Sequence, residues 1–145
     1  MAEYLANAEQ TVLLNQPAIF DASIPCRKGY VYHEDGTGIF ILRGVTQNCF
    51  ARYQVTFNGN IALPSTGTPG PIAVALAVNG ETRPTSRAVV TPAAVEEYFN
   101  VMSTAIITVP KGCCFSLSLR AVPAADEGAP ALLLENANLD ITRIA

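Results

Sequence analysis

Charged residues are scarce in this chain. Only 14% of its 145 residues are Asp, Glu, Lys or Arg, whereas 50% are hydrophobic. Soluble domains usually carry about a quarter charged residues. One small core leaves part of such an apolar surplus uncovered, so we expect the remainder to be buried between subunits. The composition therefore predicts a homo-oligomer.

Basic clusters and long apolar runs are also missing. The longest apolar run, Ile72 to Val78, is strand-sized and far short of the ~20 residues that a membrane helix needs. The seven Arg and two Lys are scattered along the sequence and the formal net charge is −3. We therefore expect neither nucleic acid nor a membrane as a partner. Residues Met1 to Tyr4 show no secretory signal, so we expect cytosolic synthesis without a signal peptide.

Catalytic side chains are few. The only histidine, His33, lies in a turn-like stretch with no nucleophile indicated beside it, so we expect an exposed turn residue. A cupin-type enzyme would need several clustered metal ligands, which one histidine does not supply. The acidic pairs Glu96-Glu97 and Asp126-Glu127 are typical of solvated loops, and a calcium site at Asp35 or Asp126 lacks dense ligand spacing. The sequence predicts no enzyme, no cofactor and no metal site.

The four cysteines match no zinc-binding spacing. They are Cys26, Cys49, Cys113 and Cys114. We expect free, buried thiols that act as small hydrophobic side chains. A Cys26–Cys49 disulfide in a mature extracellular particle is the alternative.

Alternating strand patterns dominate what is present. Apolar and polar residues alternate in 50–58, 114–120 and 138–142, and the shorter runs 39–42 and 105–109 are rich in β-branched residues. Turn signals such as Asn79-Gly80 separate them. The pattern predicts one all-β domain over residues 1–145, an antiparallel jelly-roll β-sandwich of about eight to ten strands.

Two segments depart from this pattern. Residues 1–15 are predicted to form an N-terminal arm or short helix, with Val12 to Leu14 as the opening strand. Thr91 to Tyr98 carries a cap residue, an early proline and two glutamates, which predict one or two helical turns.

Residues 72–78 are apolar on both strand faces. Alanines occupy one face, and the other carries Ile72, Val74, Leu76 and Val78. A strand of this kind is covered twice, once by its own core and once by something else. We therefore predict a subunit interface there.

Three segments resemble the C1q/TNF-like jelly rolls. Ser103 to Leu117 looks like a strand, a glycine turn and the next strand, Asn136 to Ile144 resembles the final strand, and Tyr53 to Ile61 resembles the long central strand. The resemblance covers roughly residues 10–145. It is greatest to the bacterial and phage branch, which includes the C-terminal domains of spore-surface collagen-like glycoproteins.

The resemblance implies a homotrimer about a threefold axis with no catalytic site. By position, Tyr53, Phe57 and Phe115 become candidates for packing in the core or along that axis. The sequence has no collagen-like stem or anchoring segment, which favours a stand-alone particle component. We predict a virion structural protein, most concretely a homotrimeric capsid decoration or accessory protein of a bacteriophage, with capsid proteins as partners. A bacterial surface or spore-coat adhesin of the same fold is the alternative.

Overall fold

The computed structural model describes residues 2–24, 29–66, 70–123 and 131–145, which form twelve strands and one short 3-10 helix. No helix long and apolar enough to cross a membrane occurs among these residues. The elements in chain order are β1 (Ala2–Ala6), β2 (Gln10–Leu13), β3 (Ala22–Ile24), β4 (Val31–His33), β5 (Phe40–Arg43), β6 (Phe50–Ala62), β7 (Ile72–Val78), β8 (Glu81–Thr82), η1 (Pro84–Ser86), β9 (Ala88–Val90), β10 (Phe99–Pro110), β11 (Cys114–Val122) and β12 (Ala131–Arg143).

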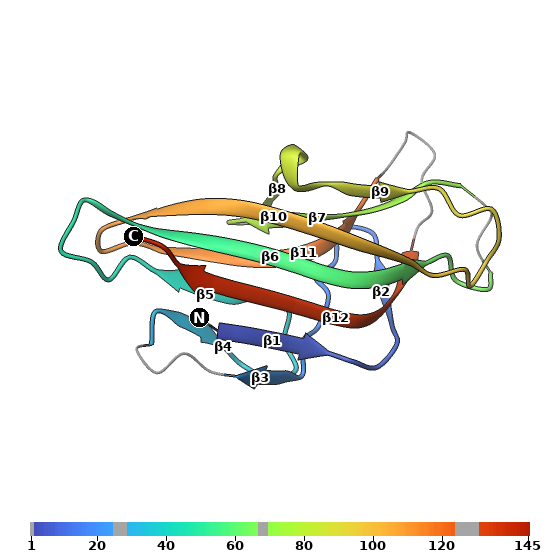
Figure 1. Cartoon of the computed structure of the whole chain (residues 1–145), viewed down its shortest axis with the longest axis horizontal. Coiled ribbons are helices and arrows are strands. Elements are labelled where there is room, and N and C mark those ends of the chain that lie inside the picture. The colour runs from blue at the N-terminus through green and yellow to red at the C-terminus, as the bar shows by residue number, and fades with distance from the viewer. Residues whose placement is uncertain (1, 25–28, 67–69, 124–130) are drawn as a thin grey trace.

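The strands form two antiparallel sheets. Sheet A has the order β10-β6-β12-β1-β3, with β2 also paired to β12. Sheet B has the order β4-β5-β11-β7-β8, with β9 also paired to β7. In Figure 1 sheet A lies in front, from β10 at the top to β3 at the bottom. The predicted jelly-roll sandwich is confirmed, and the additional strands are short ones that carry too few residues to show an alternating pattern.

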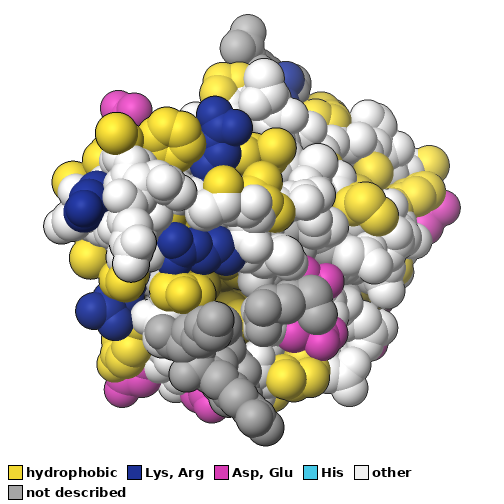
Figure 2. Space-filling model, turned by 60° about the vertical axis from the view of Figure 1, so that its left-hand side comes forward, with side chains coloured by type: hydrophobic (Ala, Val, Ile, Leu, Met, Phe, Trp, Pro, Cys, Tyr) yellow, Lys and Arg dark blue, Asp and Glu magenta, His cyan; other side chains and the backbone are white. Residues whose placement is uncertain are grey.

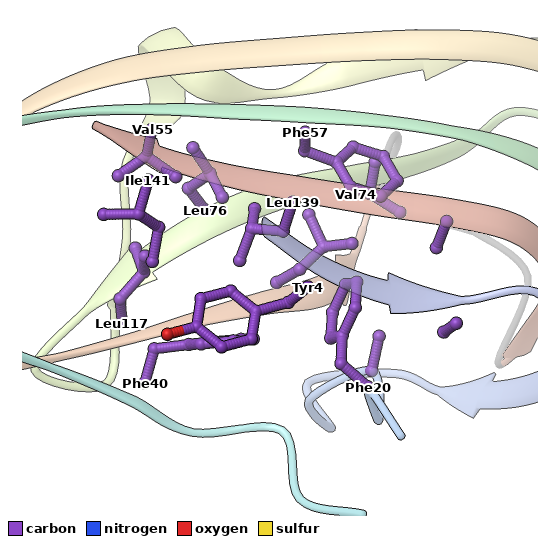
Figure 3. Close-up of a cluster of buried hydrophobic side chains, with 14 of the residues drawn as sticks. Tyr4, Phe20, Phe40, Val55, Phe57, Val74, Leu76, Leu117, Leu139 and Ile141 are labelled. Atoms are coloured by element: carbon purple, nitrogen blue, oxygen red, sulfur yellow. The ribbon is translucent and has the colours of Figure 1, made fainter. Parts of the chain in front are cut away.

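One hydrophobic core fills the space between the sheets. Along β6 every second side chain points inward, and Tyr53, Val55 and Phe57 are fully buried. They meet inward-facing side chains of sheet B such as Val74 and Leu76 (Figure 3). Each fully buried side chain of this size contributes roughly 1.5–3 kcal/mol, so alternation in the long strands is the main determinant of the sandwich.

The predicted N-terminal arm is instead a strand within sheet A. β1 pairs with β12 on one side and with β3 on the other. Ala2, Tyr4 and Ala6 point inward and are buried, and the Tyr4 ring meets the Phe40 ring edge-on at 4.6 Å. The arm prediction was wrong because this short alternation is carried mostly by alanine. The predicted strand at Val12 is confirmed as β2.

The predicted helical turns in residues 91–98 are absent. Glu96 adopts a positive φ of 58°, which a right-handed helix excludes, and its backbone N–H donates to the Leu63 carbonyl. The short helix lies earlier, at η1, between β8 and β9. There the Ser86 hydroxyl accepts a hydrogen bond from the Leu76 N–H, at 3.0 Å. In a continuous sheet, a backbone carbonyl of the neighbouring strand would accept this bond. The Asn79-Gly80 turn is as predicted, with φ of 54° and 85°.

The long strands give the molecule two distinct ends. Pro110 pairs with Phe50 at one end, and Phe99 pairs with Ile61 at the other. We call these the Phe50 end and the Ala62 end, after the first and last residues of β6. The 13 residues of β6 separate them by about 40 Å, at ~3.3 Å per residue.

Candidate functional site

Most residues predicted to form the subunit interface lie in the core of the chain itself. Tyr53, Phe57, Ile72, Val74 and Leu76 are each at most 3% exposed, so these side chains are not available to a second copy. The interface assignment is corrected for the three β7 residues, and of the two environments predicted for Tyr53 and Phe57 the structure shows the core. The second face of β7 is covered as well, since Ala73 and Ala75 form a small buried cluster with Val122. The physical reason is size: alanine presents so little surface that the chain covers it unaided.

The other two predicted interface residues have a different environment. Val78 and Phe115 are half-buried and pack against the edge of the core. Their role at an interface stays a prediction. Tyr53 also has a polar role, because its hydroxyl lies 2.6 Å from the Arg43 carbonyl oxygen, to which it donates.

His33 is buried rather than exposed, so that prediction was wrong. Its side chain has no exposed surface, and its ring stacks on Phe40 with 4.2 Å between centroids. Its Nε2 lies 2.9 Å from the Thr37 carbonyl oxygen, and its Nδ1 lies 3.8 Å from an Asp35 carboxylate oxygen. The ring also meets the Tyr4 ring edge-on, with 4.9 Å between centroids. The ring serves as an aromatic packing element that the hydrophobicity pattern does not reveal.

The cysteines are exposed, contrary to expectation. Cys49, Cys113 and Cys114 are free thiols at the surface of the Phe50 end. Their free state agrees with the prediction, and their burial does not. Cys26, the other member of the alternative disulfide, lies outside the described residues.

The outer face of sheet A is one surface that remains open for assembly. Its side chains lie in register across the strands, so that Glu3 faces Asp140, Asp140 faces Thr56 and Thr56 faces Thr104. The core-facing side chains of the same strands point to the opposite side. We define this outer face by Glu3, Leu5, Ala22, Ile24, Gln54, Thr56, Asn58, Met102, Thr104, Ile106, Asn138, Asp140 and Thr142.

Apolar side chains lie at two opposite edges of this face. At the β10 edge, Met102 is 65% exposed and Ile106 is 54% exposed. At the β3 edge, Ile24 is 56% exposed and lies across from Glu3, while the half-buried Leu5 of β1 lies across from Ala22. Strands β6 and β12 separate the two apolar edges. The β10 edge of one copy can bury this apolar surface by meeting the β3 edge of another.

Three solved structures are similar to this one. The globular domain of zebrafish complement 1qA protein matches with a TM-score of 0.64 and 15% identity, over 99% of this chain and 96% of that chain. Eiger TNF from S. frugiperda matches with a TM-score of 0.65 and 13% identity, over 100% and 92%. This chain has a C1q/TNF-like jelly-roll fold. The third, the EclA C-terminal domain, titled a sugar-binding protein, has a TM-score of 0.42 and 18% identity, over 96% and 82%.

The C1q/TNF-like fold is therefore established by structure rather than by sequence. No protein-family model matches the chain, and no curated protein matches it either. The fold resemblance stated from the sequence is confirmed at the level of the jelly roll. At 13–15% identity the likeness concerns architecture and carries no binding site from one protein to the other.

The middle of the outer face is polar and tightly organised. Towards the Ala62 end of the same face, next to the residues defined above, the Asn100 side-chain amide donates to the side-chain oxygens of Asn58 and Asn60, at 2.9 and 3.1 Å. The Asn138 amide donates to a Glu3 carboxylate oxygen, and one Asp140 carboxylate oxygen is buried with no hydrogen-bond partner among the described residues. Partial burial, and then the negative charge of Glu3, raise the pKa of the Asp140 carboxyl. This centre suits a contact that is set by polar register as well as by apolar edges.

Sequence reasoning missed Met102, Ile106 and Ile24. The sequence carries a signal for Met102 and Ile106. Along β10 these two alternate with the inward-facing positions Val101, Ser103, Ala105 and Ile107. The strand predicted from the sequence begins only at Ala105, which leaves Met102 outside the pattern. Ile24 carries no comparable signal, because three residues of β3 are too few to assign a face.

Proposed function

We propose that this chain is a non-enzymatic structural protein that assembles as a homotrimer, most concretely a capsid decoration or accessory protein of a bacteriophage. The observation that carries the assembly is the pair of exposed apolar edges on the outer face of sheet A. The C1q/TNF-like fold supports the number of subunits, because the family resemblance stated above implies a trimer.

The two apolar edges differ, so the contact between copies is heterologous. Met102 and Ile106 of one copy would meet Leu5 and Ile24 of the next, and each copy would use both edges once. A heterologous contact forms a closed ring whenever the rotation between neighbours divides a full turn. Three copies close such a ring around an axis that runs close to the strand direction.

One surface groove is lined by uncharged side chains. This shallow groove, of about 400 Å³, lies between β2 and the turn that precedes β5. Gln10, Thr11 and Thr37 are among its polar lining residues, and none of the lining residues is an acid, a base or a thiol. Within the described residues, no group of three or more His, Cys, Asp or Glu side chains is arranged to hold a metal ion.

Charge insertion at the β10 edge tests the trimer. We expect the wild-type chain to sediment at three times its 15.4 kDa mass at micromolar concentration, and Met102→Glu with Ile106→Glu to sediment as a monomer. Glutamate buries a charge and also approaches Glu3 of the neighbour. Tyr32→Glu is the matched control, because Tyr32 is 61% exposed on β4 of sheet B. A monomeric wild type, or a trimer that both variants retain, contradicts the proposal.

The virion role has its own test. Mass spectrometry of purified particles of the phage that encodes the chain should detect it at a fixed copy number relative to the major capsid protein. Trimers that are absent from the particles would contradict the virion role and leave the trimer intact. A glycan-array signal from such trimers would instead support the adhesin alternative.

A further inference from the structure

The cations that are scattered along the sequence gather in space. Arg43, Arg52, Lys111 and Arg143 all lie at the Phe50 end, where the β10–β11 turn meets the starts and ends of the neighbouring strands. Backbone hydrogen bonds connect these segments, from the Gly44 N–H to the Cys113 carbonyl and from the Ile144 N–H to the Arg52 carbonyl. Scatter along the sequence therefore does not imply scatter over the surface.

These cations contact aromatic rings and backbone oxygens, among them the Ala145 oxygen, to which the Arg143 Nε donates at 3.1 Å. The Arg52 guanidinium lies 5.0 Å from the centre of the Phe50 ring, and that of Arg143 lies 4.2 Å from the Tyr30 ring. The Arg143 Nη1 donates to the Val45 carbonyl oxygen. Among the described residues, no Asp or Glu side chain forms an ion pair with any of the four. Three of the four cations, Arg43, Arg52 and Lys111, are exposed to solvent, and Arg143 is half-buried.

Exposed apolar side chains lie between the cations. Val45, Phe50 and Ile144 are 39–49% exposed at this end. Figure 2, which brings this end forward, shows patches of Lys and Arg side chains interleaved with hydrophobic ones. By the register through β11, Glu81 on β8 lies three strand positions from Arg43, about 10 Å inward at ~3.3 Å per residue. The tip itself is cationic and apolar.

Glutamates gather at the Ala62 end, where Arg120 lies two positions before the end of β11. The Tyr98 hydroxyl donates to a Glu9 carboxylate oxygen. Partial burial raises the Tyr98 pKa, and so do this hydrogen bond and the negative charges of Glu9, Glu135 and Glu96. Glu97 is exposed next to this group, and the exposed apolar side chains of Val95 and Phe99 lie beside it. Three separate segments of the chain thus place glutamates around one tyrosine.

We propose that copies of this protein associate end to end, with the cationic Phe50 end of one copy seated on the acidic Ala62 end of the next. The occupant is a second copy because that copy supplies the complementary charge and a matching set of exposed apolar side chains. The contact uses surfaces other than the outer face of sheet A, so it goes beyond ring formation. A head-to-tail contact along the strand direction does not close, and it therefore builds stacks.

Salt dependence provides the first measurement. Charge screening acts over about 30 Å at 0.01 M salt and about 3 Å at 1 M. In sedimentation velocity at low salt we expect species at multiples of the basic unit, which increase with protein concentration and disappear in high salt. A wild-type protein of unchanged size across this range, at concentrations up to about 100 µM, overturns the proposal.

Charge-reversal variants that are mixed provide the decisive measurement. Lys111→Glu makes the Phe50 end less cationic, and Glu97→Lys makes the Ala62 end less acidic. Both side chains are exposed and form no ion pair among the described residues, so the fold should be retained. Each variant alone should self-associate at least about 10-fold more weakly, since close charge pairs couple by 1.5 kcal/mol or more. An equimolar mixture should recover the stacks, because the glutamate introduced into one variant meets the lysine introduced into the other.

The controls separate this contact from ring formation and from a general effect of net charge. Glu34→Lys gives the same change in net charge as Glu97→Lys, on an exposed side chain away from both ends, and should stack like the wild type. The ring variant Met102→Glu with Ile106→Glu should still form stacks. A failure of the proposed trimer can therefore be distinguished from a failure of the proposed stacking contact. A mixture that stays dissociated overturns the proposal. So does binding of the cationic end to duplex DNA or anionic vesicles without self-association.

Discussion

Strands β7 and β10 carry their apolar residues in opposite ways. β7 is apolar on both faces, yet the chain buries both: one in the main core and the other in the small cluster around Ala73 and Ala75. β10 alternates like an ordinary half-buried strand, yet its outward positions hold Met102 and Ile106, which are left exposed. The uninterrupted apolar run is internal, and the alternating strand carries the surface that is available to another subunit.

The difference shows that side-chain volume decides which apolar face needs a partner. Alanine at 73, 75 and 77 leaves each residue at most 1% exposed within one chain. Methionine and isoleucine on β10 project beyond the reach of their neighbours and stay more than half exposed. An interface is therefore better sought among large outward side chains than in the most hydrophobic strand.

The largest expected effect is the contrast between one buried and one exposed side chain. Leu76→Ala should lower the free energy of unfolding by about 2–5 kcal/mol, because Leu76 is fully buried in the core. Met102→Ala should change it by no more than ~0.5 kcal/mol at concentrations where the chain is monomeric, and should weaken the trimer at higher concentrations. Urea denaturation checks both. Equal losses in the two variants would place β10 in the core.

Overfilling the alanine face of β7 sharpens the same contrast. Ala75→Leu should cost about 1–3 kcal/mol, since the added side chain has no room in the buried row. The cost should be the same in the trimer and in the monomeric Met102→Glu, Ile106→Glu background. Ala94→Leu, at an exposed loop position, is the control. If Ala75→Leu lowered the stability of the trimer alone, β7 would lie at the subunit interface.

The Ser86 hydroxyl should account for part of the stability of the β7 edge. In Ser86→Ala the buried Leu76 N–H loses its acceptor at 3.0 Å, which should cost about 1–3 kcal/mol. Thr85→Ala, one residue earlier and exposed, should be within ~0.5 kcal/mol of the wild type. Hydrogen exchange at Leu76 should rise in the Ser86 variant alone.

The smallest expected effect is a pH dependence at Asp140. Because its folded pKa is raised, the folded state binds a proton more readily than the unfolded state. Stability should therefore increase as the pH falls through the folded pKa towards the ordinary carboxyl value of about 4. Asp140→Asn should flatten this part of the profile and leave stability at neutral pH unchanged or slightly higher. A profile identical to that of the wild type would show that the carboxyl is not strained.

Much of the fold could be predicted because its long strands alternate. The apolar positions of 50–58, 72–78 and 138–142 mark real strands, and the Asn79-Gly80 turn has the positive φ values that its residues favour. The short strands and η1 were not predicted, since a segment of two to five residues is compatible with several structures equally well. The cap signal at residues 91–98 was overridden by a tertiary contact, the hydrogen bond from Glu96 to Leu63.

The candidate site was harder to predict than the fold. Hydrophobicity along the chain identifies a buried residue without saying whether its own chain or another one buries it, which is why the pattern assigns Leu76 to an interface. Charge behaves similarly, because Arg43, Arg52, Lys111 and Arg143 are far apart in sequence yet share one end of the fold. Both features depend on strand register, which sequence periodicity does not determine.

The helical turn between β8 and β9 has a consequence for a protein made in many copies. A continuous outermost strand beside β7 would offer a straight row of unpaired amides and carbonyls, to which foreign strands could add. Here that border is two short strands with a kink of Pro84 to Ser86 between them, and the kink points Ser86 back at Leu76. The break denies foreign strands a straight edge to add to beside β7.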